Sequence, residues 1–208
     1  AGSGSVVKVF NKNSSTPTLS FSLNVNDVAI SADGQYFAVC GNSHVSFYSI
    51  LSSTPLWSYS GDDDYGCEDS YSQYDGNKVA ISDNGNYVVL AANQNPRGVR
   101  AYNSSTGKLI LENNNNEDTF SVDISSDGKY IVSGDQQYVR VFELSSATDT
   151  YSLKWSTSDF WSYVTDVDIS SDGKFISSVR HHNGIYRGLD YYSTDSSTPL
   201  WQAKPTPV

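Results

Sequence analysis

A short phrase recurs four times along this chain of 208 residues. It runs from an apolar residue through Ile-Ser to a turn glycine, and its copies occupy residues 28–34, 79–85, 122–128 and 167–173. The turn glycines are therefore 51, 43 and 45 residues apart. Repetition at this spacing indicates a supersecondary unit that cannot bury its apolar face alone and has to stack on its neighbours.

Each copy contains the signals for four short strands. The phrase itself is a strand that ends in Asp-Gly or Asn-Gly, a pair typical of tight hairpin turns. An aromatic and β-branched run follows at residues 36–39, 87–90, 130–132 and 175–176, as expected for a strand covered on both faces. A third strand alternates apolar and polar residues, and a fourth begins near the phrase Ser-Thr-Pro-Leu-Trp at residues 53–57 and 197–201. We expect the first two strands to lie innermost and the fourth outermost.

Four antiparallel strands per repeat, without any helical period, predict an all-β fold of propeller blades. We predict a single β-propeller of about four and a half four-stranded blades. The expected boundaries are an outer half-blade at 1–24, blade 1 at 25–61, an inserted acidic loop at 62–76, blade 2 at 77–115, blade 3 at 116–158 and blade 4 at 159–208.

On these phrases the chain resembles WD-repeat-like and quinoprotein-type (PQQ-like) β-propeller repeats of archaeal or bacterial surface proteins. The resemblance covers nearly the whole chain and implies architecture more than chemistry. The chain departs from WD repeats in lacking their Gly-His and Trp-Asp signatures. It keeps a single good quinoprotein-type turn, at residues 103–109.

The first residues read as half a blade. Residues 7–17 align without a gap on residues 45–55, so the sequence opens with a third and a fourth strand and offers no first or second. Such an edge is a template for pairing with another chain, and we expect the assembly edge to comprise Val6, Val7, Val9 and Phe10. The expected partners are other copies of this chain, which could form a filament, or missing parts of a longer chain. The absence of methionine favours a partial or processed chain.

Composition limits the partners and the compartment. The net charge is −10 and the few Lys and Arg are dispersed, which argues against nucleic acid because its recognition needs a clustered basic face. No apolar run approaches the roughly 18 residues of a membrane-spanning helix. The low charged fraction and two glycosylation sequons, at Asn13 and Asn103, favour an extracellular or cell-surface protein, although a Ser-rich sequence also produces sequons by chance.

The two cysteines allow two interpretations. Cys40 ends a second strand and Cys67 lies in the acidic loop, so a disulfide would attach that loop to its blade. Cys40 would equally suit a buried free thiol. We favour the disulfide.

The acidic loop is the most unusual local feature. Asp62, Asp64 and Glu68 are weak calcium candidates, because calcium takes six to eight oxygen ligands, but their spacing matches no EF-hand and a solvated loop is the commoner outcome. No other cofactor is expected. His181 and His182 would point to opposite faces of a strand and cannot easily share a metal. The repeated Asp33, Asp127 and Asp172 occupy positions that hairpin turns require.

No nucleophile elbow, phosphate loop or catalytic triad pattern occurs in the sequence, so we predict that the chain is not an enzyme. The leading hypothesis is an extracellular structural or adhesive scaffold that completes its open half-blade with strands of a neighbouring subunit. One alternative is a module that recognises a sugar or protein ligand, with Trp161 and Tyr163 at its axial face. The other is a fragment of a quinoprotein-type enzyme.

The aromatic residues at equivalent repeat positions are expected to fill the seams between blades; they include Trp57, Tyr59, Trp155 and Trp201.

Overall fold

A computed structural model describes residues 6–41, 43–60, 67, 78–92, 97–115, 117–157, 162–182 and 185–203. None of them lies in a helix, so no helix that could cross a membrane is found among them. The eighteen strands form one two-stranded and four four-stranded sheets, each an antiparallel meander. The prediction of an all-β propeller fold is confirmed.

The sheets follow one another along the chain and are named here by that order. The first sheet is β1 (Val6–Phe10) and β2 (Pro17–Ser22), and the second is β3 (Asp27–Ile30), β4 (Tyr36–Gly41), β5 (His44–Ser49) and β6 (Trp57–Ser60). The third is β7 (Val79–Ile81), β8 (Tyr87–Ala92), β9 (Gly98–Asn103) and β10 (Leu109–Asn114). The fourth is β11 (Thr119–Ile124), β12 (Tyr130–Asp135), β13 (Val139–Ser145) and β14 (Thr150–Ser156), and the last is β15 (Tyr163–Ile169), β16 (Phe175–His182), β17 (Ile185–Ser193) and β18 (Trp201–Ala203).

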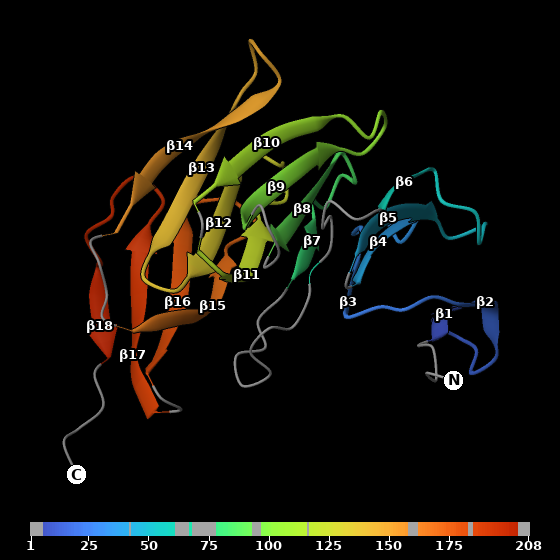
Figure 1. Ribbon diagram of the computed structural model, residues 1–208, viewed down its shortest axis with the longest axis horizontal. Coiled ribbons are helices and arrows are strands. Elements are labelled where there is room, and N and C mark those ends of the chain that lie inside the picture. Colours follow the sequence, from blue (N-terminus) through green and yellow to red (C-terminus); the bar gives the residue numbers. More distant parts are fainter. Residues whose placement is uncertain are drawn as a thin grey trace.

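The five sheets stand side by side, with the first sheet at one end of the molecule and the last at the other (Figure 1). The first strands of neighbouring sheets contact one another, which places them innermost as the sequence predicts. The second strands of the second, third and fourth sheets are covered on both faces; Ala38 and Val39, for example, are fully buried. The apolar core consists of four clusters, and each cluster lies between two consecutive sheets.

The recurring phrase forms the same hairpin turn each time. In the second sheet the Ser31 hydroxyl donates to the Asp33 carboxylate at 2.6 Å and accepts from the Tyr36 N–H at 3.1 Å. The turn glycine has a φ of +66° at Gly34, a left-handed conformation that glycine adopts without a Cβ penalty. The aspartates of these turns therefore hold the hairpins, as their positions in the repeat predict.

A disulfide joins Cys40 of β4 to Cys67, closing a sequence separation of 27 residues. Both cysteines are fully buried. Two further contacts attach this point to the second sheet: the Cys67 N–H donates to the Gly41 carbonyl at 2.9 Å, and the Asn26 side-chain amide donates to the Cys67 carbonyl at 2.7 Å. The predicted inserted loop, residues 62–76, lies outside the described residues apart from Cys67.

We predict that replacing Cys67 by Ser lowers the free energy of unfolding by about 3 kcal/mol, because the unfolded chain regains the entropy of an open 27-residue loop. Urea unfolding followed by circular dichroism measures this change. The reduced wild-type protein is the matched control and should lose a similar amount. Equal stability of the oxidised and reduced proteins would contradict the prediction.

Candidate interaction surface

An aromatic ring and a glycine meet at every seam between the four-stranded sheets. The aromatic residue that begins a second strand lies against the hairpin glycine of the next sheet. A Cβ added at Gly85 would lie 3.4 Å from the Tyr36 ring, and one added at Gly173 would lie 3.0 Å from Tyr130. A Cβ at Gly128 would overlap Tyr87. The same glycine thus serves its own turn and receives its neighbour's ring.

Tryptophans of the outer strands join two of these seams. Trp57 lies 5.4 Å from the ring of Tyr102 and donates its indole N–H to the Ser104 carbonyl at 2.7 Å. In the same way Trp155 lies 5.8 Å from Tyr192 and donates to the Thr194 carbonyl at 2.6 Å. These rings fill seams, as expected from the sequence.

Of the other aromatic residues named in the sequence analysis, Tyr59 follows that pattern and Trp201 does not. Tyr59 also lies in a seam, where its hydroxyl donates to the Gly107 carbonyl at 2.8 Å. Trp201, at the equivalent position of the last sheet, instead leaves 49% of its surface exposed. Trp161 lies outside the described residues.

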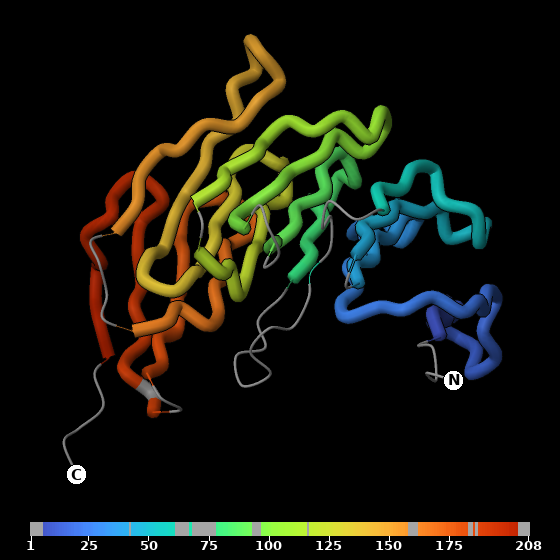
Figure 2. Tube along the Cα trace, in the orientation of Figure 1, coloured from blue at the N-terminus to red at the C-terminus, as the bar shows by residue number. Residues whose placement is uncertain are grey.

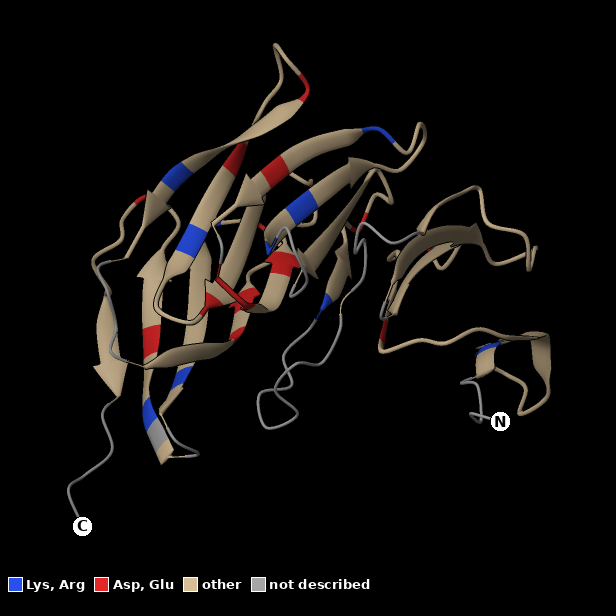
Figure 3. Ribbon diagram, viewed as in Figure 1, with Lys and Arg blue, Asp and Glu red and all other residues tan. Residues whose placement is uncertain are grey.

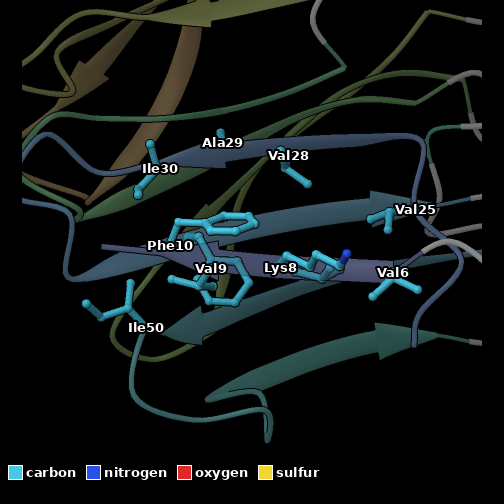
Figure 4. Close-up of a pocket in the computed structure, with 11 residues that line it drawn as sticks. Val6, Lys8, Val9, Phe10, Val25, Val28, Ala29, Ile30 and Ile50 are labelled. Carbon is cyan, nitrogen blue, oxygen red and sulfur yellow. The ribbon is translucent and has the colours of Figure 1, made fainter. Parts of the chain in front are cut away.

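The first sheet leaves an edge open beside an apolar groove. β1 pairs with β2, and no other strand among the described residues pairs with it. The groove has a volume of about 450 Å³ and runs between β1 and β3 (Figure 4). Lys8 is the charged residue that lines the groove, and the other lining side chains are apolar.

Residues of the second sheet are exposed in this groove although their repeat equivalents are buried. Val28 and Ile30 of β3 leave 58% and 61% of their surfaces exposed. Their counterparts in the fourth sheet, Val122 and Ile124, are buried against the third sheet. The inner half of the face of the second sheet is therefore uncovered, at the place where the repeat pattern puts two further strands.

The expected assembly edge divides between the two faces of β1. Val7 is buried and Val9 is partly buried in the apolar cluster shared with the second sheet. Val6 and Phe10 lie on the other face and are about half exposed. The structure therefore leaves two of the four residues, together with the free edge itself, accessible to a partner.

The remaining sequence candidates are scattered. Asp62, Asp64 and Glu68 lie outside the described residues, and the part of the chain that the structure describes holds no group of three or more His, Cys, Asp or Glu side chains that could bind a metal. His181 contacts the Thr165 hydroxyl through Nδ1 at 2.8 Å, whereas the ring of His182 stacks on Tyr163 at 6.3 Å.

The two sequon asparagines differ in accessibility. Asn13 is exposed. Asn103 is partly buried, and its side-chain oxygen accepts hydrogen bonds inside its own turn, including those from the Ser105 hydroxyl at 2.8 Å and the Thr106 N–H at 3.2 Å. In the folded chain Asn13 is therefore the more accessible of the two sequons. Glycosylation at either site stays a prediction.

Sequence reasoning missed a set of aspartates that join first strands across seams. The Asp27 carboxylate accepts the backbone N–H groups of Lys78 at 2.7 Å and Val79 at 3.0 Å. Asp123 accepts the N–H of Ile169 in the next sheet at 2.9 Å and that of Ile124 at 2.8 Å. The signal available was the aspartate that stands within or directly before the recurring phrase.

Burial makes Asp123 a weaker acid than an ordinary aspartate. Desolvation raises the pKa of Asp123 to about 6, and the neighbouring charges of Asp168 and Asp166 add to the rise, against the opposing effect of the two N–H donors. Desolvation also raises the pKa of Asp166. The Asp123 carboxylate is held in a seam by its bond to the Ile169 N–H. Among the described residues, Lys and Arg are spread over several sheets (Figure 3).

Comparison with known families and structures supports this architecture. The WD40 model (WD domain, G-beta repeat) matches residues 14–49 and 107–143. Each match covers the last strand of one sheet and the first three strands of the next, so the sequence repeat is offset by one strand from the sheet. The predicted resemblance to WD repeats is confirmed for these two segments, while the quinoprotein-type resemblance and the surface-protein origin stay predictions.

Two solved structures are similar in fold. Hydrazine synthase of Kuenenia stuttgartiensis is 15% identical over 87% of this chain and 49% of its own, with a TM-score of 0.60. A chain of the mitotic checkpoint complex is 17% identical over 85% of this chain and 53% of its own, with a TM-score of 0.64. This chain spans about half the length of either, and these identities show the fold alone. No curated protein matches the chain.

A pair of glycine substitutions tests the seam. Gly34→Ala should cost about 1–2 kcal/mol of unfolding free energy, because alanine is strained at a φ of +66°. No clash adds to this cost, since no atom lies within 4 Å of the added Cβ. Ala at Gly128 has a similar φ and also overlaps Tyr87, so it should cost at least about 1 kcal/mol more. Chemical denaturation measures both. Equal losses would show that Tyr87 does not depend on the glycine.

The acidity of Asp123 predicts a pH dependence of stability. The pKa of Asp123 in the folded chain, about 6, lies above its ordinary value of 3.8. The stabilising contribution of Asp123 is therefore fully present below pH 3.8 and is lost as the pH rises through 6. Wild type should therefore lose on the order of 2–3 kcal/mol between pH 4 and pH 7 relative to Asp123→Asn. Urea unfolding at both pH values measures the difference.

Asp172→Asn is the matched control. Lys174, together with the Ser170 hydroxyl, lowers the pKa of Asp172 to about 2. Its contribution is therefore present above pH 3.8 and lost only as the pH falls towards 2. The control should leave the slope between pH 4 and pH 7 unchanged. The same slope in Asp123→Asn and wild type would refute the assignment.

Proposed function

We propose that this chain is a non-enzymatic, extracellular propeller that serves as a structural or adhesive scaffold. It assembles with copies of itself by completing its two-stranded first sheet with strands of a neighbouring subunit. Propellers of WD40 repeats are typically scaffolds or interaction modules, which is the coarser role that the family match supports.

The observation that carries the proposal is the groove beside β1. A free strand edge offers backbone N–H and C=O groups to an incoming strand, and Val28 and Ile30 offer apolar surface next to it. Burying an aliphatic side chain of this size contributes about 1.5–3 kcal/mol. A strand that enters the groove thus gains both backbone hydrogen bonds and apolar burial.

This contact would join two different surfaces head to tail, which favours a filament. The groove lies at the first sheet, and the last sheet lies at the opposite end of the molecule. A contact between two different surfaces is heterologous, and it forms an open filament wherever its rotation does not close a ring.

Two features support work outside the cell. The Cys40–Cys67 disulfide fits an oxidising compartment. The low charged fraction of 17% leaves a surface rich in hydroxyl and amide groups, as is common in extracellular proteins.

The non-enzymatic role is supported by how the perturbed groups are used. Asp123 bonds across a seam, and the Tyr151 hydroxyl, whose pKa burial raises, donates to the Gly128 carbonyl.

A second candidate function is recognition of a protein ligand, which the WD40 match favours. For a sugar ligand or a quinoprotein-type enzyme, the described residues bring together no matching set of side chains.

We predict that Ile30→Lys weakens self-association about tenfold or more, because it places a charge in the groove that a neighbouring strand has to fill. Leu51→Lys is the matched control, since Leu51 is 85% exposed outside the groove and should change nothing. Sedimentation velocity over a range of concentrations measures the association. A monomeric wild type, or equal association of the two variants, would sink the proposal.

A further inference from the structure

The last sheet presents a ladder of three stacked aromatic rings. Phe175 stacks on Tyr191 at 5.4 Å with an interplanar angle of 13°, and Tyr191 stacks on Trp201 at 5.8 Å with an angle of 24°. Each ring comes from a different strand, β16, β17 and β18.

The second sheet contains the same ladder in the same order. Tyr36 stacks on Phe47 at 5.4 Å and 15°, and Phe47 stacks on Trp57 at 5.6 Å and 20°. There the third sheet covers it: Phe47 is buried, and Trp57 is held by the ring of Tyr102 and the Ser104 carbonyl. The ladder is therefore the half of a seam that a following sheet receives.

In the last sheet this half-seam is uncovered. Trp201 is 49% exposed whereas Trp57 is partly buried, and Tyr191 is partly buried whereas Phe47 is buried. Phe175 differs little from its equivalent, since it is 38% exposed and Tyr36 is 36% exposed. The exposure of Leu200 carries no such meaning, because its equivalent Leu56 is equally exposed beside a complete seam. Trp201 thus has the stacking surface and the indole donor of Trp57.

The matching receptor is present at the other end of the same chain. Residues 14–17 repeat the Ser-Ser-Thr-Pro phrase of residues 196–199. The turns also share their hydrogen bonds: the Ser14 N–H donates to the Asn11 carbonyl at 2.9 Å, as the Ser196 N–H donates to Ser193 at 3.1 Å. The turn of residues 193–199 is the one that receives Trp155, through the Thr194 carbonyl.

The equivalence extends to the two groups that a tryptophan contacts. By the same alignment Lys12 stands where Thr194 stands, and Phe10 stands where Tyr192 stands. Tyr192 is fully buried under Trp155, whereas Phe10 is 51% exposed. Phe10 and Lys12 are thus the uncovered half of a seam that lacks its tryptophan.

We infer that Trp201 of one copy stacks on Phe10 of the next copy and donates its indole N–H to the carbonyl oxygen of that copy's Lys12. β1 and β18 lie at opposite ends of the trace, so the two halves do not meet within the described residues of one copy (Figure 2). This inference rests on the proposed self-assembly and names the surface with which the neighbour docks. The interface then repeats the chemistry of the internal seams at Trp57 and Trp155.

The first test uses single variants at both halves. Trp201→Ala and Phe10→Ser should each weaken self-association at least tenfold, and Trp201→Phe should give a smaller loss because it keeps the ring but not the N–H donor. Leu200→Ser is the matched control, adjacent to Trp201 and exposed, and should associate like wild type. Circular dichroism and urea unfolding confirm that each variant is folded.

Mixing the variants tests the head-to-tail geometry. Trp201→Ala keeps an intact Phe10 receptor, and Phe10→Ser keeps an intact Trp201 ladder. Each should be monomeric alone, and the equimolar mixture should form dimers but nothing larger, because the heterodimer has no intact pair left at its ends. Mass photometry distinguishes these species.

Other outcomes separate the two proposals. If Ile30→Lys abolishes assembly and Trp201→Ala does not, the groove assembles copies and the inference about Trp201 is wrong. If Trp201→Ala abolishes assembly and Ile30→Lys does not, the inference stands without the strand exchange. A natural protein that stays monomeric while its Trp201 is protected from acrylamide quenching would overturn the inference, since further residues of the same chain would then cover the ladder.

Discussion

Each sheet of this chain buries its apolar surface against the sheets next to it, and the other features of the structure depend on that burial. The four apolar clusters correspond one to one with the four seams between sheets. Polar contacts at a seam are few and directional, as at Asp123 and Trp155. Apolar burial provides the free energy of stacking, and these bonds fix the register in which two sheets meet.

A seam of this kind has two different halves, and a row of sheets therefore ends in two different surfaces. At one end Ile30 is exposed where two inner strands of the first sheet would cover it, and Phe10 is exposed where a sheet before the first would cover it. At the other end Trp201 is exposed where a following sheet would cover it. Neither surface needs chemistry that the interior lacks. In the assembly that we propose, association at the ends continues the stacking of sheets, and this is why the residues of the seams also indicate the partner.

The sequence was sufficient to predict the sheets because turn chemistry and strand period agree in every copy. The Asp-Gly and Asn-Gly turns and the aromatic residues after them placed each hairpin, and the gapless alignment of residues 7–17 on 45–55 predicted the two-stranded first sheet. Contacts between sheets could not be predicted in this way. The bonds of Asp27 to Lys78 and of Trp57 to Ser104 join residues about 50 positions apart, and their geometry depends on how two sheets are packed.

The exposure of Trp201 shows why a repeat has to be read together with its neighbours. In sequence it is equivalent to Trp57, and propensity or periodicity predicts the same burial for both. They differ in the structure because a following sheet covers Trp57 and no described sheet covers Trp201. Burial is thus set by the neighbouring sheet and not by the residue itself. In a chain built from one repeated unit, an interaction site is therefore found where a residue departs from its own equivalents, and Phe10, Ile30 and Trp201 are three such departures.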